Sequence, residues 1–493
     1  MIGKLKDAAS NVMSNFSQKN DGIQVEKVQK PEKYTYARPY FLGLDKDEVK
    51  CAQDFSLRPV LKPRKIEDMV LHCGYAECIN GGKSDNNEDN AYACHLQIKT
   101  TYTNCNSKSA NPAAKNSVSG NGSKQKDGIF ERSMVEIASH GTIQSPVAVY
   151  YGIFDGHAGH QTSLIVSRLL HQHVQDKLKE CVDLIKEKTS GVPPCPFDAF
   201  SNISIDDLVT GALEEAFKDM DDYLEQERCR YNVKGGCTSL VVLLLEGKMY
   251  IANAGDSRAV LCHGDKVQAM TKDFNPVTDR KRINYIGHLH PELLHDEFTC
   301  LEFPRRVNKG DVGQAMLCRK PGRDGWCYKT IVEDDLKFPL VTGDGKKARI
   351  MATIGVTRGL GDHDLYVFDS DIWIKPFLSC KPEVRVIDLT EHQWTEDDVL
   401  ILGTDGLWDV ITNQEASDIV HKEFSSCNKT DLKKYTIAAQ ELVSEARGHF
   451  TGQGWKKRNG DTASFDDITV MIIPILTYLN QWKAGHLLDS GIT

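Results

Sequence analysis

The chain has 493 residues, a net charge of −9 and fifteen cysteines. It is long enough to bury a substantial core, and its acidic balance, with no long basic run, argues against a protein built to hold nucleic acid. The cysteines are odd in number and form no C-x-x-C pair, so the sequence suggests neither a zinc ribbon nor a complete disulfide framework. Reduced thiols in a cytosolic protein are the simplest interpretation.

The first twenty residues predict an amphipathic helix. Ile2, Leu5 and Phe16 share one apolar stripe, and the opposite face carries Ser and Asn with few charges, as in helices that lie among lipid headgroups. A helix docked on its own domain, or a disordered leader, is the alternative. The apolar run Leu240 to Leu245 is too short to span a bilayer, and the start lacks the apolar core of a signal peptide. We therefore expect a cytoplasmic protein, at most peripheral on intracellular membranes through residues 1–17.

A lead-in over 21–69, broken by four prolines, is expected to wrap a single catalytic domain at 70–476. Within that domain, strands are predicted at Val70 to Glu77 and Asp89 to Ile98. The segment 100–128 is rich in Ser, Asn, Lys and Gly and has almost no large apolar residue, which predicts a disordered surface insertion.

The next elements are a strand at Val147 to Phe154, rich in β-branched and aromatic residues, and two long helices. The helices are predicted at Gln161 to Lys188 and Asp206 to Arg228. Ser204 and Asp207 make a capping box at the start of the second.

Three short strands then follow in close order, at Thr238 to Glu246, Met249 to Ala254 and Ser257 to His263. Their short connections predict antiparallel neighbours. Four further elements are expected in the C-terminal half: strands at Val399 to Thr404 and Asp467 to Ile475, and helices near Gln414 to Glu423 and Leu432 to Arg447. Strands cluster with strands and helices with helices, which indicates an α+β fold built on antiparallel sheets, followed by a tail at 477–493.

Acidic residues stand at the ends of several predicted strands or in glycine-flanked turns: Asp155, Asp256, Asp362, Asp405, Asp466 and Asp467. Any one of them alone is more simply a turn residue. Together, they would repel unless a cation compensated them, and an all-oxygen ligand set selects a hard ion such as magnesium or manganese. Two such ions can activate a water and stabilise the oxygens of a phosphate group in transfer. The cluster thus suggests metal-assisted phosphoester hydrolysis.

Six motifs occur in order along the chain: FDGHAGH, GGCTSLVVLL, IANAGDSRAVL, VTRGLGD, LGTDGLWDV and DDITVMII. They resemble the successive motifs of the metal-dependent protein serine/threonine phosphatases of type 2C. The resemblance spans about Val70 to Ile475 and implies a sandwich of two central antiparallel β-sheets flanked by helices, with a two-metal centre at one end. It also implies hydrolysis of phosphoserine and phosphothreonine by a water that two Mg²⁺ or Mn²⁺ ions activate, without a covalent phosphoenzyme.

The same resemblance implies a role for particular residues. Asp155 would bridge both metals, and Gly156 would contribute its backbone carbonyl. Asp405 and Asp466 would hold one of the two ions.

The remaining matched positions are Glu88 and Asp89, which would support the other ion through waters, and Asp256 and Asp362, which would hold a third, weaker ion. His157 falls on the general acid that protonates the leaving oxygen, a role suited to a group that titrates near neutral pH. Without the resemblance, a buried and merely satisfied imidazole is the simpler interpretation.

Three features depart from the pattern. Ser84 stands where the family has a phosphate-binding Arg, and the adjacent Lys83 offers a point charge without the fork of Arg; the alternative is ordinary loop solvation. Asp467 stands where an Asn is usual, so either Asp466 or Asp467 could face the metal. A long flap at about 284–348 is locally basic through Arg305, Arg306, Lys309, Arg319, Lys320 and Arg323, which suggests substrate docking or a solvated surface.

The long flap, the NED variant and the amphipathic leader together resemble the animal subgroup lettered H, J and M. That implies phosphorylated protein substrates, with membrane-bound Rab-type small GTPases as candidates. Two other functions stay open: a catalytically dead relative that binds phosphoproteins, and a two-metal phosphatase of small molecules. No expected strand–loop–helix junction carries the C-x5-R of a cysteine phosphatase, and the sequence does not indicate an oligomeric state.

Overall fold

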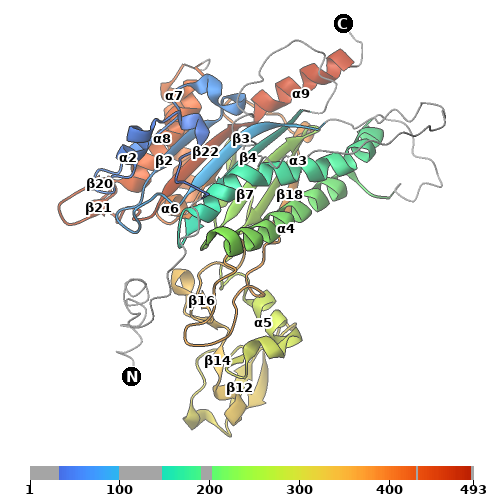
Figure 1. Ribbon diagram of the computed structural model, residues 1–493, viewed down its shortest axis with the longest axis vertical. Coiled ribbons are helices and arrows are strands. Elements are labelled where there is room, and N and C mark those ends of the chain that lie inside the picture. The colour runs from blue at the N-terminus through green and yellow to red at the C-terminus, as the bar shows by residue number, and fades with distance from the viewer. Residues whose placement is uncertain (1–32, 99–146, 190–201, 429–430, 490–493) are drawn as a thin grey trace, which may run out of the picture.

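The computed structural model describes residues 33–98, 147–189, 202–428 and 431–489 (Figure 1). The expected amphipathic helix at 1–20 and the insertion at 100–128 lie outside these residues. In the described part of the chain, no helix is both long enough and apolar enough to cross a membrane.

The centre of the molecule is formed by two antiparallel sheets, of six and five strands. The six-stranded sheet runs in the order β1 (Val60–Leu61), β2 (Gly74–Cys78), β22 (Ile468–Pro474), β19 (Val399–Gly403), β9 (Arg258–His263) and β10 (Lys266–Ala269). The five-stranded sheet runs in the order β18 (Glu383–Asp388), β8 (Lys248–Ala254), β7 (Ser239–Leu245), β4 (Val147–Phe154) and β3 (Asn90–Gln97). All neighbouring strands pair antiparallel, as the sequence predicted.

Apolar side chains from the inner faces of both sheets form the central core, among them Tyr151, Val242, Leu402 and Met471. The outer face of the five-stranded sheet is covered by α3 (Gln161–Thr189) and α4 (Ile205–Tyr231), and that of the six-stranded sheet by α7 (Asn413–Ser426) and α8 (Lys433–Arg447) (Figure 1). Strand β7 is buried along its whole length because both of its faces are covered. The α+β sandwich flanked by helices is therefore confirmed.

The chain changes sheets between β8 and β9, where the sequence predicted two antiparallel neighbours. Strand β8 pairs with β7 and β18, whereas β9 pairs with β10 and β19 in the other sheet. The prediction was wrong because a short link at Gly255 and Asp256 fits a sheet-to-sheet corner as well as a hairpin. The corner brings Asp256 to the edge of the sandwich.

Two other boundaries differ from the prediction. The strand expected from Val70 begins only at Gly74, because 3₁₀ turns η3 (Ile66–Asp68) and η4 (Val70–His72) precede it. The segment expected as a tail from 477 belongs to helix α9 (Ile475–Asp489), in which Tyr478 and Leu479 are buried. The lead-in contributes η2 (Tyr40–Leu42) and α2 (Lys46–Ala52).

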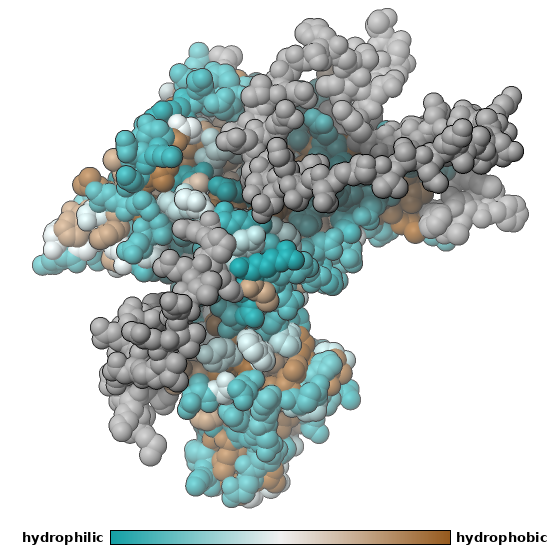
Figure 2. Space-filling model, viewed as in Figure 1, coloured by the Kyte–Doolittle hydropathy of each residue, from teal (hydrophilic) through white to brown (hydrophobic). Residues whose placement is uncertain are grey.

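The flap forms a separate lobe below the sandwich (Figure 1). It contains α5 (Arg280–Leu289), η5 (Pro291–Leu294), β11 (Phe298–Thr299), η6 (Lys309–Asp311), β12 (Ala315–Cys318), β13 (Cys327–Thr330), η7 (Glu333–Leu336), β14 (Phe338–Pro339), β15 (Val341–Thr342), η8 (Gly345–Lys347) and β16 (Arg349–Ile350). Its apolar core includes Leu294 and Leu340, and Phe377 from the segment that follows the flap also packs there. Figure 2 shows hydrophobic side chains among hydrophilic ones on the surface of this lobe.

The remaining short elements lie in the links between these layers: β5 (Gly156–His157), β6 (Gly236–Cys237), β17 (Leu360–Gly361), η9 (Leu389–Glu391), α6 (Asp405–Trp408), β20 (His449–Phe450) and β21 (Trp455–Lys456). Strands β5, β6 and β17 form a small sheet in the order β17-β6-β5. That sheet and α6 position the candidate site.

Candidate active site

Strand register brings the predicted acidic residues to one edge of the sandwich. The end of β4 at Phe154 pairs with the start of β3 at Asn90, so Asp155 lies next to the segment that carries Glu88 and Asp89. In the other sheet the end of β19 at Gly403 pairs with Val470 at the start of β22. Asp405 and the Asp466–Asp467 turn therefore meet at the same edge.

The glycine after each of the two recurring aspartates allows a close approach of two chains. A Cβ on Gly156 would lie 2.3 Å from the carbonyl oxygen of Glu88. A Cβ on Gly406 would lie 1.9 Å from the carbonyl oxygen of Asp467. Both Asp-Gly pairs thus pack an aspartate-bearing chain directly against a neighbouring acidic segment, which explains why the same dipeptide recurs at the two strand ends.

The clustered carboxylates raise one another's pKa. Burial, followed by the charge of Asp405, raises the pKa of Asp155 well above its usual value, and more distant carboxylates add to the effect. Burial and the charge of Asp466 raise the pKa of Asp405 to about 6. Burial and mutual repulsion disfavour the ionised form of these carboxyl groups, so a cation at the site would stabilise it.

The other acidic residues at this edge behave in the same way. Burial and the charge of Asp405 raise the pKa of Asp256, and burial and the charge of Asp467 raise that of Asp89. Burial also raises the pKa of Glu88. The Thr404 hydroxyl donates to Asp89 at 2.9 Å, which ties the NED segment to the end of β19.

The structure distinguishes Asp466 from Asp467. One oxygen of Asp467 accepts from the backbone and side-chain nitrogens of Asn80, at 2.7 and 3.1 Å, and the other accepts from the backbone nitrogen of Glu88 at 2.9 Å. Asp467 thus holds the loop in place. Both oxygens of Asp466 instead accept from the ammonium of Lys83 at 2.8 Å.

Lys83 lies over the acidic cluster. Burial opposes its charge, but Asp466 and the more distant Asp155 and Asp405 outweigh that effect and raise the pKa of Lys83 above its usual value. Ser84, which the resemblance aligned with the phosphate-binding Arg, donates to the carbonyl of Asn86 at 2.6 Å and so shapes the loop.

His157 and Asp362 form a pair that the sequence did not predict. In the small sheet, β6 pairs with both β5 and β17, which brings the His157 Nε2 to 2.8 Å from the Asp362 Oδ2. Burial disfavours the imidazolium, but the Asp362 carboxylate outweighs burial and raises the pKa of His157. The resemblance implied that Asp362 would hold a third metal ion. In the structure, its carboxylate contacts the His157 imidazole instead.

Asp221 on α4 supports this pair from behind. Its Oδ1 accepts from the backbone nitrogen of Gly361 at 2.9 Å and from the ammonium of Lys375 at 2.8 Å. It also lies 3.2 Å from the His363 Nε2. Asp362 has a φ of +57°, an unusual backbone conformation for an aspartate, and this buried network fixes the residues on both sides of it.

Two arginines of the lead-in brace the acidic edge from beneath, and sequence reasoning missed both. Arg38 forms a two-bond pair with Glu77 and donates to the carbonyls of Asn87 and Asp89 at 3.1 and 2.7 Å. This contact fixes the backbone on either side of Glu88.

Arg58 does the same for the other segment. It is fully buried and donates to the carbonyls of Ile79, Ser464 and Asp466 at 2.7, 2.6 and 2.9 Å. The sequence gives little indication of these bracing roles, because both arginines stand in the lead-in, which was expected only to wrap the domain.

The donor set fits a hard divalent cation. Among the described residues, no three His, Cys, Asp or Glu side chains already stand in the arrangement of a metal site. The fit lies in the chemistry: carboxylates from separate strand ends, with pKa values raised by each other's charge, are the oxygen ligands that Mg²⁺ and Mn²⁺ take. The residues that could hold such ions are Asp155, Gly156, Asp405 and Asp466.

Comparison with known proteins gives a consistent result. The chain matches the family "Protein phosphatase 2C" over residues 116–287 and 340–451, a match that leaves out most of the flap. It is 41% identical to "Protein phosphatase 1H" of Xenopus tropicalis, over 96% of this chain and 99% of that protein. It is 43% identical to "Protein phosphatase 1J" of Mus musculus, over 93% of this chain and 90% of that protein.

A solved structure, "Crystal structure of serine-threonine phosphatase 2C from Toxoplasma gondii", shares 18% identity at a TM-score of 0.37, covering 66% of this chain and 84% of that one. That likeness is too low to add to the argument. The identity to the two phosphatases extends over nearly the whole chain, and the family match covers more than half of it. The chain belongs to the protein phosphatase 2C family.

Proposed function

We propose that this protein phosphatase hydrolyses phosphoserine and phosphothreonine in proteins with the help of Mg²⁺ or Mn²⁺ ions at the strand-end carboxylates. Family membership supports protein phosphatase activity. The observation that carries the finer proposal is the convergence of Asp155, Asp405 and Asp466, whose charges raise the pKa values of Asp155 and Asp405. A site with this demand for positive charge suits two divalent ions, and Asp256 adds a carboxylate for a further one.

Divalent ions bound there would supply a nucleophilic water and offset the charge of the transferred phosphate. The chain's own groups would do the rest. His157, whose pKa is raised by the Asp362 carboxylate, is positioned to give a proton to the leaving serine or threonine oxygen. Lys83 offers a point charge to the substrate phosphate, without the bidentate geometry of an arginine.

Rival functions are weaker. The chain has one C-x5-R spacing, from Cys300 to Arg306, but the Arg306 guanidinium donates to the carbonyls of Leu336 and Lys337, so this flap segment is no phosphate-binding loop. A scaffold that only binds phosphoproteins would not need several partly or fully buried acidic groups at one edge. A phosphatase of small molecules shares the same centre, and the choice of substrate separates it from the main proposal.

The structure changes which flap residues are candidates for docking a substrate. Arg305 pairs with Asp311 through two bonds, Arg306 lies over the Phe338 ring, and Arg319 pairs with Glu302, so these cations hold the lobe together. Charge reversal at Arg305 and Arg306 would therefore damage the flap itself. The other three basic residues of the set, for which no partner is described, are Lys309, Lys320 and Arg323.

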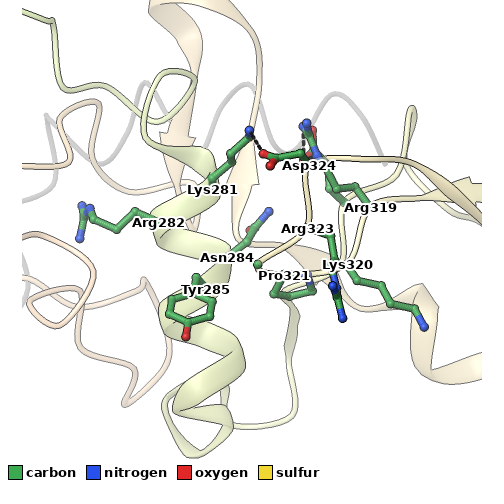
Figure 3. A pocket seen from close by; sticks show the side chains of 11 residues that line it. Lys281, Arg282, Asn284, Tyr285, Arg319, Lys320, Pro321, Arg323 and Asp324 are labelled. Atoms are coloured by element: carbon green, nitrogen blue, oxygen red, sulfur yellow. Dashed lines mark hydrogen bonds and ion pairs between the residues drawn. The ribbon is translucent and has the colours of Figure 1, made fainter.

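Lys320 and Arg323 line a cavity of ≈ 540 Å³ between α5 and the loop after β12 (Figure 3). Tyr285 stands at its wall, and Lys281 reaches across the top to Asp324 at 2.5 Å. We infer that an acidic segment of the phosphoprotein substrate docks here, because the cavity is lined by two cations that have no partner among the described residues.

Membrane-associated phosphoproteins such as Rab-type small GTPases are the substrates we propose, on the strength of the similarity to the H and J relatives and the amphipathic pattern of residues 1–17. Cytoplasmic location with peripheral membrane contact belongs to the same proposal. Flotation with liposomes tests it: Leu5→Asp and Phe16→Asp should each reduce binding relative to the wild type. Equal binding by all three proteins would remove the membrane proposal.

The main proposal is tested by phosphate release from a phosphothreonine peptide with Mn²⁺, Mg²⁺ or a chelator. We expect release with either ion and none with the chelator, and far slower turnover of sugar and nucleotide phosphates. No release with any metal by folded protein would favour the scaffold function. Faster turnover of the small phosphates would favour the small-molecule enzyme.

A further inference from the structure

We propose that Cys318 and Cys327 form a reversible disulfide when the protein meets a small-molecule disulfide such as oxidised glutathione. The bond would join β12 to β13 and close the loop that lines the flap cavity. It would be a modification site separate from the acidic edge of the sandwich.

The strand register sets the two cysteines directly opposite each other. In the β12–β13 pair, Cys318 faces Cys327 and Leu317 faces Tyr328. Opposite residues of an antiparallel pair share one face of the sheet, with Cα atoms about 4.5–5.5 Å apart. A disulfide accepts Cα separations of about 4.4–6.8 Å, so the backbone needs no rearrangement. Among the described strand pairs, no other register sets two cysteines opposite each other.

The Cys327 thiol already lies against the partner strand. The Cys327 Sγ is 3.5 Å from the backbone carbonyl oxygen of Cys318, so its side chain leans across to the partner strand. Both cysteines are reduced in this structure. Opposite Cβ atoms in a sheet lie slightly farther apart than those of a relaxed disulfide, about 4.5–5.5 against 3.5–4.5 Å, so closing the bond adds strain. A strained disulfide is easily reduced again, which suits a reversible modification in a reducing compartment.

The solvent exposure of the two cysteines indicates which thiol reacts first. Cys327 is exposed, whereas Cys318 is buried and its thiol pKa is raised by that burial. Cys327 is therefore the thiol that meets the oxidant, and Cys318 is the one that resolves the intermediate. The basic residues Lys320 and Arg323 in the connecting loop favour the approach of an anionic oxidant such as glutathione disulfide.

The chemistry balances without any group from the protein beyond these thiols. The Cys327 thiolate attacks one sulfur of glutathione disulfide, forms a mixed disulfide and expels one glutathione thiolate. The Cys318 thiolate then attacks the Cys327 sulfur, forms the Cys318–Cys327 bond and expels the second glutathione. The protein loses two electrons and two protons, and the oxidant gains both as two glutathione thiols.

The bond would restrain the wall of the cavity. The loop between the two cysteines supplies six of the cavity's eleven lining residues, Arg319 to Asp324, and Figure 3 shows it facing α5. Among the described residues, the polar links from this loop to its surroundings are the Lys281–Asp324 pair and the side-chain and backbone pairing of Arg319 with Glu302. Closing a ten-residue ring at its base would reduce its freedom, so oxidation would alter how the cavity receives a ligand.

Mass spectrometry of the full-length protein tests the proposal. The reduced protein is treated with glutathione disulfide, its remaining thiols are alkylated, and it is digested with trypsin without reduction. We expect peptides 310–319 and 324–329 to appear joined, and to separate after a reductant is added. Finding both peptides alkylated, or Cys327 held as a stable mixed disulfide in the wild type, would overturn the proposal.

Two controls sharpen the result. Cys51 is an exposed cysteine outside the flap and should stop at the mixed disulfide with glutathione. The variant Cys318→Ala should trap the mixed disulfide at Cys327, because the resolving thiol is gone. If Cys51 instead links to another cysteine as readily as Cys327 does, the register argument fails.

The effect on the loop is measured by hydrogen exchange on the wild type, which needs no substitution. Amides of 319–326 should exchange more slowly in the oxidised protein, and those of the β4–β7 sheet should not change. Unchanged exchange in 319–326 would remove the proposed effect on the cavity even if the bond forms.

Discussion

In the flap, the Arg305 guanidinium binds both carboxylate oxygens of Asp311, whereas at the strand ends the carboxylate of Asp155 lies beside that of Asp405. Both regions are dense in charge. The flap arranges most of its charge in opposite-sign pairs that hold a small lobe together, but the strand ends bring like charges together at a protein edge. Charge density alone therefore says little about function, and like charges that raise each other's pKa say more.

The largest effect is expected from removing one of the like charges. Asp155→Asn should abolish phosphatase activity and, in chelator, raise the stability of the fold by ~1 kcal/mol, because a mutually repelling carboxylate is gone. Thermal unfolding and phosphate release measure the two effects. Asp467→Ala is the matched control: it loses three hydrogen bonds from Asn80 and Glu88, so its stability should fall. If Asp155→Asn were less stable than the wild type in chelator, repulsion between the strand-end carboxylates would not be the dominant effect at this site.

The next effect concerns the proton donor. His157→Ala should lower kcat on a phosphothreonine peptide by about 10²–10⁴-fold, the range typical of general acid catalysis. The loss should be much smaller with p-nitrophenyl phosphate, whose leaving oxygen needs no proton. Equal losses on the two substrates would show that His157 only shapes the site.

The bracing arginines should have an intermediate effect. Arg58→Lys cannot reach the carbonyls of Ile79, Ser464 and Asp466 together, and it should lower stability by about 2 kcal/mol and activity by about 10–100-fold. Arg64, an exposed arginine of the same lead-in, is the control, since Arg64→Lys should change neither quantity. If Arg58→Lys changed neither stability nor activity, Arg58 would not brace the acidic edge.

A pH profile tests the pair of His157 with Asp362. Asp362 raises the pKa of His157, so the protonated form persists to higher pH than in a free imidazole. Activity that depends on the His157 proton is highest below the pKa that His157 has in the folded protein, and it is lost as the pH rises through that pKa. Asp362→Asn removes the raising charge, and the alkaline limb of kcat should move to lower pH. An unmoved limb would show that another group sets it.

The smallest effect is expected in the flap. Lys320→Glu with Arg323→Glu should raise KM several-fold for an acidic phosphoprotein and leave p-nitrophenyl phosphate turnover unchanged. Arg305→Gln is the contrasting variant, which should loosen the lobe because its Asp311 pair is lost. Parallel losses on both substrates in the double variant would argue against docking in the cavity.

The helices and strands of the sandwich were predicted well, because the spacing of apolar residues along the chain indicates which side chains are buried. β4 was predicted to the residue, and α3 and β3 to within one residue at each end, as the β-branched runs and apolar stripes required. The antiparallel pairing expected across Gly255 was wrong, since a short link does not reveal which sheet the next strand joins. The acidic residues were found because Asp-Gly recurs after apolar strands.

Contacts between distant parts of the chain could not be predicted. Nothing local marks Arg38 or Arg58 as bracing residues, because their partners are backbone carbonyls far along the chain and a buried glutamate. The pairing of His157 with Asp362 depends on a three-stranded sheet of very short strands, each too brief to show a period. The flap was interpreted as a basic surface because the sequence does not show which carboxylates pair with its arginines.

The central claim is that the like charges at the strand ends are a divalent cation site. Calorimetric titration of Mn²⁺ into the purified full-length protein, beside Asp155→Asn, tests it without reference to any substrate. We expect the wild type to bind Mn²⁺ and the variant to lose at least one binding event. Binding of Mn²⁺ that is the same in both proteins, or absent from the folded wild type, would contradict the account.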